Sequence, residues 1–191
     1  MKNVILIHGW NTKTEFFDPD KPTASNDHWF PWLTKQLMVQ GVHTVALEMP
    51  NGYYPEYAVW KHELERFDIT PETILVGHSC GGGFIVRWLS ETDKKVGKVV
   101  LVAPWLGYGT EGEPFDETFF DFIIDPEIPS KTAGLTLIHS SNDMPGVQQS
   151  VREIREKLHT IRYVELENKG HFTRTSLGTD AFPELLGEIL R

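Results

Sequence analysis

The sequence predicts an α/β fold in which a parallel sheet of about six strands carries helices on both faces. Short apolar runs rich in Val, Ile and Leu alternate along the chain with longer segments whose apolar residues recur every three or four positions. The first pattern is typical of strands buried on both faces, and the second of amphipathic helices. No repeat or linker divides the 191 residues, so we expect a single domain spanning 1–191 with a sizeable core.

The predicted strands are short apolar runs, and several of them end at a polar residue or a glycine. The first, "VILI", stops at "HG", and the third, "TILV", stops at Gly77. Buried parallel strands have this length and composition, whereas helices need longer segments. The six strands are predicted at residues 4–7, 43–47, 73–76, 99–102, 135–138 and 161–166.

The predicted helices follow these strands and each has one apolar face. In the second helix, Tyr57, Trp60, Leu64 and Phe67 recur at helical spacing. Gly41 marks the end of the first helix, since glycine is common just after the last turn. The five helices are predicted around residues 29–39, 57–67, 82–89, 147–158 and 182–190.

Composition and charge narrow the classes of partner. The chain carries a formal net charge of −9 and no cluster of Lys or Arg, which argues against binding to nucleic acid or to anionic membranes. No apolar run approaches the ~20 residues that span a bilayer, and the first ten residues do not resemble a signal peptide. With one cysteine, Cys80, no intrachain disulfide forms. We therefore expect a cytoplasmic protein with a small-molecule substrate; the sequence does not give its oligomeric state.

Residues 77–81, "GHSCG", match the pattern G-x-S-x-G directly after the third predicted strand and directly before a predicted helix. In that context the pattern indicates a sharp strand-to-helix turn that exposes the serine hydroxyl, here that of Ser79. Bulky side chains at Gly77 and Gly81 would collide with neighbouring backbone. Because ligands of parallel sheets bind beyond the carboxyl ends of the strands, we predict that Ser79 is a nucleophile.

A serine hydroxyl needs a base to accept its proton. Of the eight histidines, His171 is the strongest candidate for this base. It stands in "NKGHF", between the last strand and the last helix, where a loop can reach the carboxyl edge of the sheet. His139, at the end of the fifth strand, is the second choice. His8 and His78 are interpreted as buried structural residues near the site.

The histidine in turn needs an acid to orient it, and Asp143 follows the fifth strand in "HSSNDMPGV". The chain order Ser79, Asp143, His171 is the order expected for this architecture. Asp116, on the long loop after the fourth strand, is the main competitor for the acid. Two further aspartates are weaker candidates, Asp121 and Asp125.

An oxyanion site is expected from two backbone N–H groups, one after the nucleophile and one on the loop after the first strand. These are the N–H groups of Cys80 and Trp10, with Asn11 as the alternative to Trp10. No Cys and His spacing typical of a metal site is found around them, so we expect no metal and no cofactor.

With these residues in place, the sequence resembles the α/β-hydrolase superfamily, and within it the small serine hydrolases of the YdeN and retinoblastoma-binding-protein-nine type. The resemblance covers nearly the whole chain and rests on "VILIHGW", "HWFPWL", "ILVGHSCGG", "KVVLVAPW", "LIHSSNDMPGV" and "NKGHF". It implies a compact sheet with little or no lid, and a triad of Ser79, Asp143 and His171. The Leu-x-Cys-x-Glu pattern associated with retinoblastoma binding is absent around Cys80.

The predicted function is hydrolysis of a small ester, thioester or amide through an acyl-enzyme. Three aromatic residues are expected to line the substrate pocket: Trp105, Phe119 and Phe172. The segment 107–128 is the candidate for a partial cover, and its acidic residues favour a cationic or neutral substrate. Two alternatives remain: an idle hydrolase fold that binds a protein, and other chemistry on this fold, such as perhydrolysis or carbon–carbon cleavage.

Overall fold

The computed structural model describes residues 3–109 and 115–191, and its centre is one sheet of six strands that all pair in parallel. The strands lie in the order β2-β1-β3-β4-β5-β6. This confirms the predicted sheet. The strands are β1 (Asn3–Ile7), β2 (His43–Leu47), β3 (Thr73–His78), β4 (Val96–Val102), β5 (Thr132–Ser140) and β6 (Arg162–Leu166).

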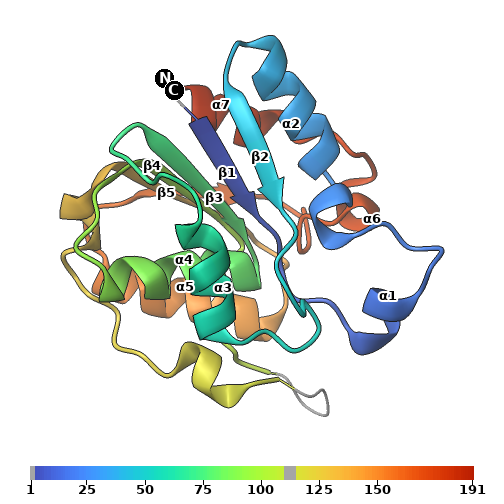
Figure 1. The fold of residues 1–191 in the computed structure, drawn as a ribbon, viewed down its shortest axis with the longest axis horizontal. Helices are drawn as coiled ribbons and strands as arrows, with labels where there is room; N and C mark the ends of the chain where they lie inside the picture. The colour runs from blue at the N-terminus through green and yellow to red at the C-terminus, as the bar shows by residue number, and fades with distance from the viewer. Residues whose placement is uncertain (1–2, 110–114) are drawn as a thin grey trace.

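Helices cover both faces of the sheet, as predicted. Figure 1 shows α2 and α7 side by side on one face, and α3, α4 and α5 on the other. Right-handed crossovers require α2 to lie on the opposite face from α3, α4 and α5, because the chain runs one way from β1 to β2 and the opposite way from β2 onward. The helix α7 follows the last strand and so belongs to no crossover. These helices are α2 (Phe30–Val39), α3 (Tyr57–Glu65), α4 (Cys80–Glu91), α5 (Pro145–Lys157) and α7 (Pro183–Leu190).

The structure adds short elements that the sequence pattern does not predict. Two are single-turn α-helices near the carboxyl edge of the sheet, α1 (Lys13–Phe17) and α6 (Arg174–Leu177). A capping box formed by Thr12 and Glu15 begins α1. Three are 3-10 turns, η1 (Ala24–Asn26), η2 (Glu117–Phe120) and η3 (Ile128–Lys131).

The strand order reverses at β1, and this reversal positions the site. The chain leaves β1 toward β2 on one side, and later returns to form β3 on the other side. Ile7 at the end of β1 is opposite Gly77 near the end of β3. The loops that follow these two strands therefore begin side by side and diverge, which is where ligands bind in sheets of this kind.

None of the helices in the described ranges, 3–109 and 115–191, is long and apolar enough to cross a bilayer.

Candidate active site

Ser79 occupies the turn between β3 and α4 in a conformation that few residues adopt. Its φ is +54° and its ψ is −121°, and backbone of this kind costs about 1–3 kcal/mol when the residue is not glycine. Hydrogen bonds hold the turn: the Ser79 N–H donates to the Val102 carbonyl at 2.9 Å, and the Ser79 carbonyl accepts from Trp105 at 3.0 Å. The packed structure thus fixes the partly buried hydroxyl at the surface of the cavities that Ser79 lines.

Gly77 and Gly81 allow backbone segments to approach this turn closely. A Cβ at Gly77 would lie 2.5 Å from the Gly81 carbonyl oxygen, and a Cβ at Gly81 would lie 2.4 Å from the His8 carbonyl oxygen. Both distances are far inside van der Waals contact, and both partners are backbone atoms that cannot turn away. The glycines of the motif are therefore required by packing between β1, β3 and α4.

The structure brings the three predicted side chains together in one hydrogen-bonded row. The Ser79 hydroxyl lies 2.9 Å from His171 Nε2, within hydrogen-bond distance. On the other side of the ring, His171 Nδ1 lies 2.9 and 3.1 Å from the two carboxylate oxygens of Asp143. The Asp143 carboxylate has no exposed surface and also accepts the Met144 N–H at 2.7 Å. A buried carboxylate in this position fixes the ring, with Nδ1 protonated and Nε2 free to take a proton.

Hydrogen bonds between two loops set the distance between Asp143 and His171. Ser140 Oγ accepts the N–H of Lys169 at 2.9 Å, and the side-chain oxygen of Asn142 accepts the N–H of Gly170 at 2.8 Å. The loop after β5 is thereby joined to the loop after β6, and each carries one member of the row.

His78 is buried beside His171 and contacts its backbone. The His171 carbonyl lies 2.9 Å from His78 Nε2, and because a carbonyl only accepts, Nε2 carries the proton. Burial holds the pKa of His78 well below its usual value, and the nearby His171 is the second cause of this lowering. A neutral imidazole at this position ties the turn before Ser79 to the loop of His171.

His8 is also buried and has a structural role. The Met49 N–H donates to its Nε2 at 2.8 Å, and its Nδ1 lies 2.6 Å from the Gly9 carbonyl. Nε2 therefore carries no proton, and burial lowers the pKa of the ring. Both interpretations of the sequence, for His8 and His78, agree with these contacts.

The alternative candidates have other partners. His139, the second choice for the base, lies 4.0 Å from the Glu165 carboxylate and packs near Tyr163. The Asp116 carboxylate caps η2, accepting the backbone N–H and the hydroxyl of Thr118 at 2.9 and 2.7 Å. Of the weaker candidates, Asp125 pairs with Lys131 at 2.7 Å, and Asp121 is exposed at the end of η2. Within the described residues, none of these four forms a hydrogen bond with Ser79 or His171.

The oxyanion candidates differ in whether their N–H groups are free. Cys80 is the first residue of α4, so its N–H has no acceptor within the helix. The Asn11 N–H donates to the Gly52 carbonyl at 3.1 Å, which removes it as an alternative. Within the described residues, the structure shows no acceptor for the Trp10 N–H. The geometry thus favours Cys80 and Trp10.

Of the three aromatic residues expected to line the pocket, the structure places only Trp105 there. Trp105 lies beside Ser79 in a cavity of about 500 Å³. Phe119 has no exposed surface and packs against Trp60 with ring centres 5.2 Å apart. Phe172 is equally buried and stacks on Phe182 at 5.1 Å. The prediction for Phe119 and Phe172 is therefore corrected: both belong to the core.

The segment 107–128 was predicted as a partial cover, and its residues 110–114 lie outside the described residues. In the described part, Tyr108 lines the cavity beside Trp105, and Phe115 packs on Trp105 with ring centres 5.0 Å apart. Tyr108 therefore forms part of the cavity wall, and Phe115 packs against another wall residue, Trp105.

A second cavity on the other side of Ser79 was not predicted. It measures about 420 Å³, and its polar walls come from α1, the turn before α2, and α6. A sequence signal existed for part of it, since Thr12 and Glu15 have the spacing of a capping box. No group of three or more His, Cys, Asp or Glu residues within the described ranges is arranged to hold a metal ion.

Comparison with known proteins now gives the family. A family model described as serine hydrolase matches residues 4–188. The chain belongs to the serine hydrolase family. YdeN of Bacillus subtilis, which is named as a hydrolase, is 27% identical to this serine hydrolase over 175 residues, covering 90% of this chain and 86% of YdeN.

Solved structures show that this serine hydrolase has the α/β-hydrolase fold. The crystal structure of the B. subtilis YdeN gene product matches with a TM-score of 0.82 at 24% identity, covering 100% of this chain and 97% of the other. Est1E from Butyrivibrio proteoclasticus matches with a TM-score of 0.66 at 14% identity, covering 99% and 86%. At these identities the structures establish the fold, and the resemblance stated from the sequence is confirmed.

Proposed function

We propose that this hydrolase cleaves a small ester, thioester or amide through an acyl-enzyme on Ser79, as a carboxylesterase-like enzyme. The observation that carries the proposal is the row from Ser79 to His171 to Asp143, with 2.9 Å between Ser79 Oγ and His171 Nε2 and 2.9 Å between His171 Nδ1 and Asp143. Nucleophilic acyl transfer requires a base positioned on an accessible serine hydroxyl, and a buried carboxylate that orients this base.

In the first half of the reaction, Ser79 Oγ attacks the substrate carbonyl carbon while its proton moves to His171 Nε2. The Asp143 carboxylate stabilises the imidazolium that forms. The Cys80 and Trp10 N–H groups bind the developing oxyanion, and Cys80 opens a helix of 12 residues whose N-terminus favours negative charge. When the tetrahedral intermediate collapses, the bond to the leaving group breaks, and His171 gives that group its proton.

In the second half, a water molecule takes the place of the leaving group. His171 Nε2 accepts a proton from this water, whose oxygen attacks the acyl carbon. The bond between Ser79 Oγ and the acyl group then breaks, and Ser79 recovers its proton from His171. The carboxylic acid product leaves and the starting state returns.

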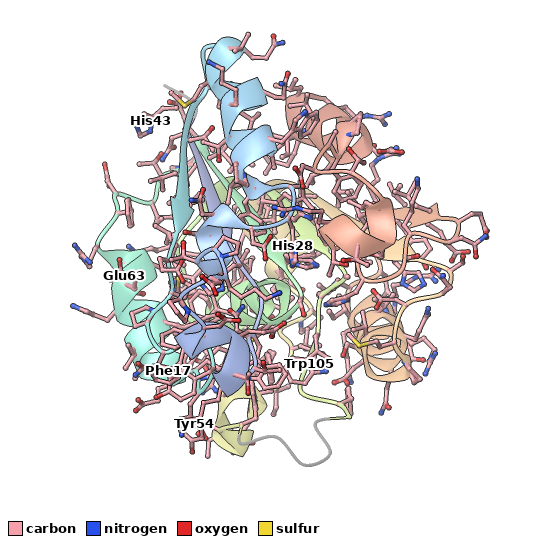
Figure 2. All side chains as sticks on the ribbon, turned by 90° about the vertical axis from the view of Figure 1, so that its right-hand side faces the viewer. Phe17, His28, His43, Tyr54, Glu63 and Trp105 are labelled. Atoms are coloured by element: carbon pink, nitrogen blue, oxygen red, sulfur yellow. The ribbon has the colours of Figure 1, made fainter. Side chains whose placement is uncertain are left out.

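The test is labelling with a fluorophosphonate, a reagent that reacts with activated serines, followed by mass spectrometry of the modified peptide. We expect the label on Ser79, and its loss in Ser79→Ala and His171→Ala. The matched control is His43→Ala, because His43 is exposed on the edge strand β2, far from His28 and Trp105 in Figure 2. A folded wild type without label would contradict the proposal and would favour the idle fold that binds a protein.

A further inference from the structure

Two cavities of different character meet at Ser79. One measures about 500 Å³ and the other about 420 Å³. Trp10, Ser79 and His171 line both, so Trp10 stands between them next to the nucleophile. Figure 2 shows His28, which lines the smaller cavity, near the middle of the molecule, and Trp105, which lines the larger one, below it. A bound carbonyl at Ser79 would extend one substituent toward each cavity.

The larger cavity, which we name the apolar pocket, has no charged side chain among the described residues that line it. Apart from Ser79 and His171, its main walls come from Trp10, Trp105, Tyr108, Met144, Pro145 and Val147. The polar atoms of its aromatic residues are already paired. The indole N–H groups donate to the carbonyls of Tyr53 and Tyr108, at 2.9 and 2.7 Å, and the Tyr108 hydroxyl donates to Glu153. What remains for a ligand is apolar surface, which favours an apolar group.

The smaller cavity, which we name the polar pocket, has the opposite character. Its polar walls come from Asn11, Glu15, Lys21, Asp27, His28 and Arg174. Two of these are acids and two are bases, so the charged side chains of the pocket sum to zero. Asp27 and Arg174 pair with each other at 3.1 Å. Lys21 has no hydrogen-bond or ion-pair partner for its side chain within the described residues, so its ammonium group is free to donate.

Water in these two pockets would bind differently. The polar pocket offers it hydrogen bonds, which a purely apolar substituent would remove without replacement, at a cost in affinity. Away from Ser79, His171 and the Trp10 N–H, the apolar pocket offers it few, and a polar substituent placed there would lose its own hydrogen bonds to water. Each pocket therefore selects against the group that suits the other.

We propose that the substrate is an ester or amide whose scissile carbonyl joins an apolar group, bound in the apolar pocket, to an uncharged hydrogen-bonding group, bound in the polar pocket. This inference rests on the proposed function, since it places the carbonyl at Ser79. It names the substrate class and leaves the reaction unchanged.

The test compares four esters that combine apolar and polar halves. Two are isomers with mixed halves, 2-hydroxyethyl phenylacetate and benzyl 3-hydroxypropanoate. The others are benzyl phenylacetate, which is apolar on both sides, and 2-hydroxyethyl 3-hydroxypropanoate, which is polar on both. Each kcat/KM is divided by the rate constant for hydrolysis by hydroxide, to remove intrinsic reactivity. We expect at least one mixed ester to exceed both uniform esters by about tenfold or more, the scale at which a pocket discriminates one substituent. A smaller ratio overturns the proposal.

Two substitutions assign the halves to the pockets. Met144 is 53% exposed at the rim of the apolar pocket, and Met144→Gln makes that rim polar at similar volume. It should reduce the preference for the mixed ester over the ester that is polar on both sides by about threefold or more. Lys21→Met removes the free ammonium group of the polar pocket. It should reduce the preference for the mixed ester over benzyl phenylacetate, which is apolar on both sides.

The matched controls are Met38→Gln and Lys35→Met, both exposed on α2 and outside both pockets. They should leave all four values unchanged. If the pocket variants change the four esters equally, the two-pocket assignment is wrong. Fluorophosphonate labelling separates the two proposals: labelled Ser79 without a preference for a mixed ester refutes only the substrate class, and unlabelled Ser79 refutes the proposed function itself.

Discussion

At the scale of single residues, the buried carboxylate of Asp143 is the feature that separates it from the competing acids. Both of its oxygens lie within hydrogen-bond distance of His171 Nδ1, and it has no exposed surface. The Asp116 carboxylate instead accepts a hydrogen bond from Thr118. In Asp143→Asn, the amide no longer stabilises a protonated ring, and we expect kcat on a reactive ester to fall by about 10⁴-fold.

The matched substitution is Asp116→Asn, which should stay within a few-fold of wild type. Steady-state kinetics of the two variants, with circular dichroism to verify folding, make the comparison. The reverse result, a large loss in Asp116→Asn alone, would reassign the acid.

His78 acts on the reaction through another residue, so we regard it as a positioning residue. In His78→Leu the His171 carbonyl loses its donor, and we expect kcat to fall about tenfold with little change in KM, the scale of one lost hydrogen bond. His78→Gln keeps an N–H group at a similar reach and should recover part of kcat. Equal losses in both variants would indicate that ring packing, and not the hydrogen bond, matters.

The sequence predicts the positions of candidate catalytic residues well where the topology of the sheet alone determines them. Ser79, Asp143 and His171 each follow a strand, and parallel strands bring their carboxyl ends to one edge, so their meeting could be foreseen. The order of strands and loops along the sequence does not predict the direction in which a loop side chain points. Phe172 is adjacent to His171, but its side chain stacks on Phe182 in the core. Its backbone has a φ of +54°.

At the scale of elements, two glycines in helical positions should respond in opposite ways to the same substitution. A Cβ at Gly81 meets backbone at 2.4 Å, whereas a Cβ at Gly187 in α7 meets nothing within 4 Å. We expect Gly81→Ala to destabilise the protein by about 3 kcal/mol or more, since overpacking against backbone cannot be relieved. Gly187→Ala should stabilise it by about 0.5–1 kcal/mol, through helix propensity.

Urea unfolding followed by circular dichroism measures both changes. If Gly81→Ala were as stable as wild type, the backbone around Gly81 would have to move apart to accept a methyl group, and the packing argument would be wrong.

Element bounds were predicted less well than element order. The predicted fourth and fifth strands covered only the apolar runs, but β4 begins at Val96 and β5 at Thr132. These extra residues pair with each other across the two strands, Val96 with Thr132 and Lys98 with Gly134. A strand can thus continue on backbone hydrogen bonds past residues such as Lys98 and Gly134, which interrupt the apolar run. Short helices such as α1 escape detection for a related reason, since five residues are too few to show a period.

At the scale of the whole molecule, buried neutral histidines make stability depend on pH. Burial lowers the pKa values of His8 and His78 below 6.5, so the unfolded chain binds protons that the folded protein does not. The free energy of unfolding must then fall as the pH drops below about 6.5. Between pH 7.5 and 5.5 we therefore expect the free energy of unfolding to decrease, with a contribution from each of these two residues.

Urea titrations at the two pH values test this expectation. His78→Gln should remove part of the loss, and His43→Gln, which alters an exposed residue, should keep all of it. A stability that does not change with pH would mean that these rings take up protons in the folded state. The prediction of one domain over 1–191 is tested by the same curves, since a single cooperative transition is expected.

Cys80 offers a way to observe the molecule opening at the place where it reacts. It is the one thiol of the chain, it has no exposed surface, and burial raises the pKa of its sulfur. A thiol reagent can therefore modify only those molecules whose turn after β3 has come apart. Its rate of reaction, measured without denaturant, counts these rare events at the residue next to Ser79, and so reports how often the nucleophile loses the geometry on which its reactivity depends.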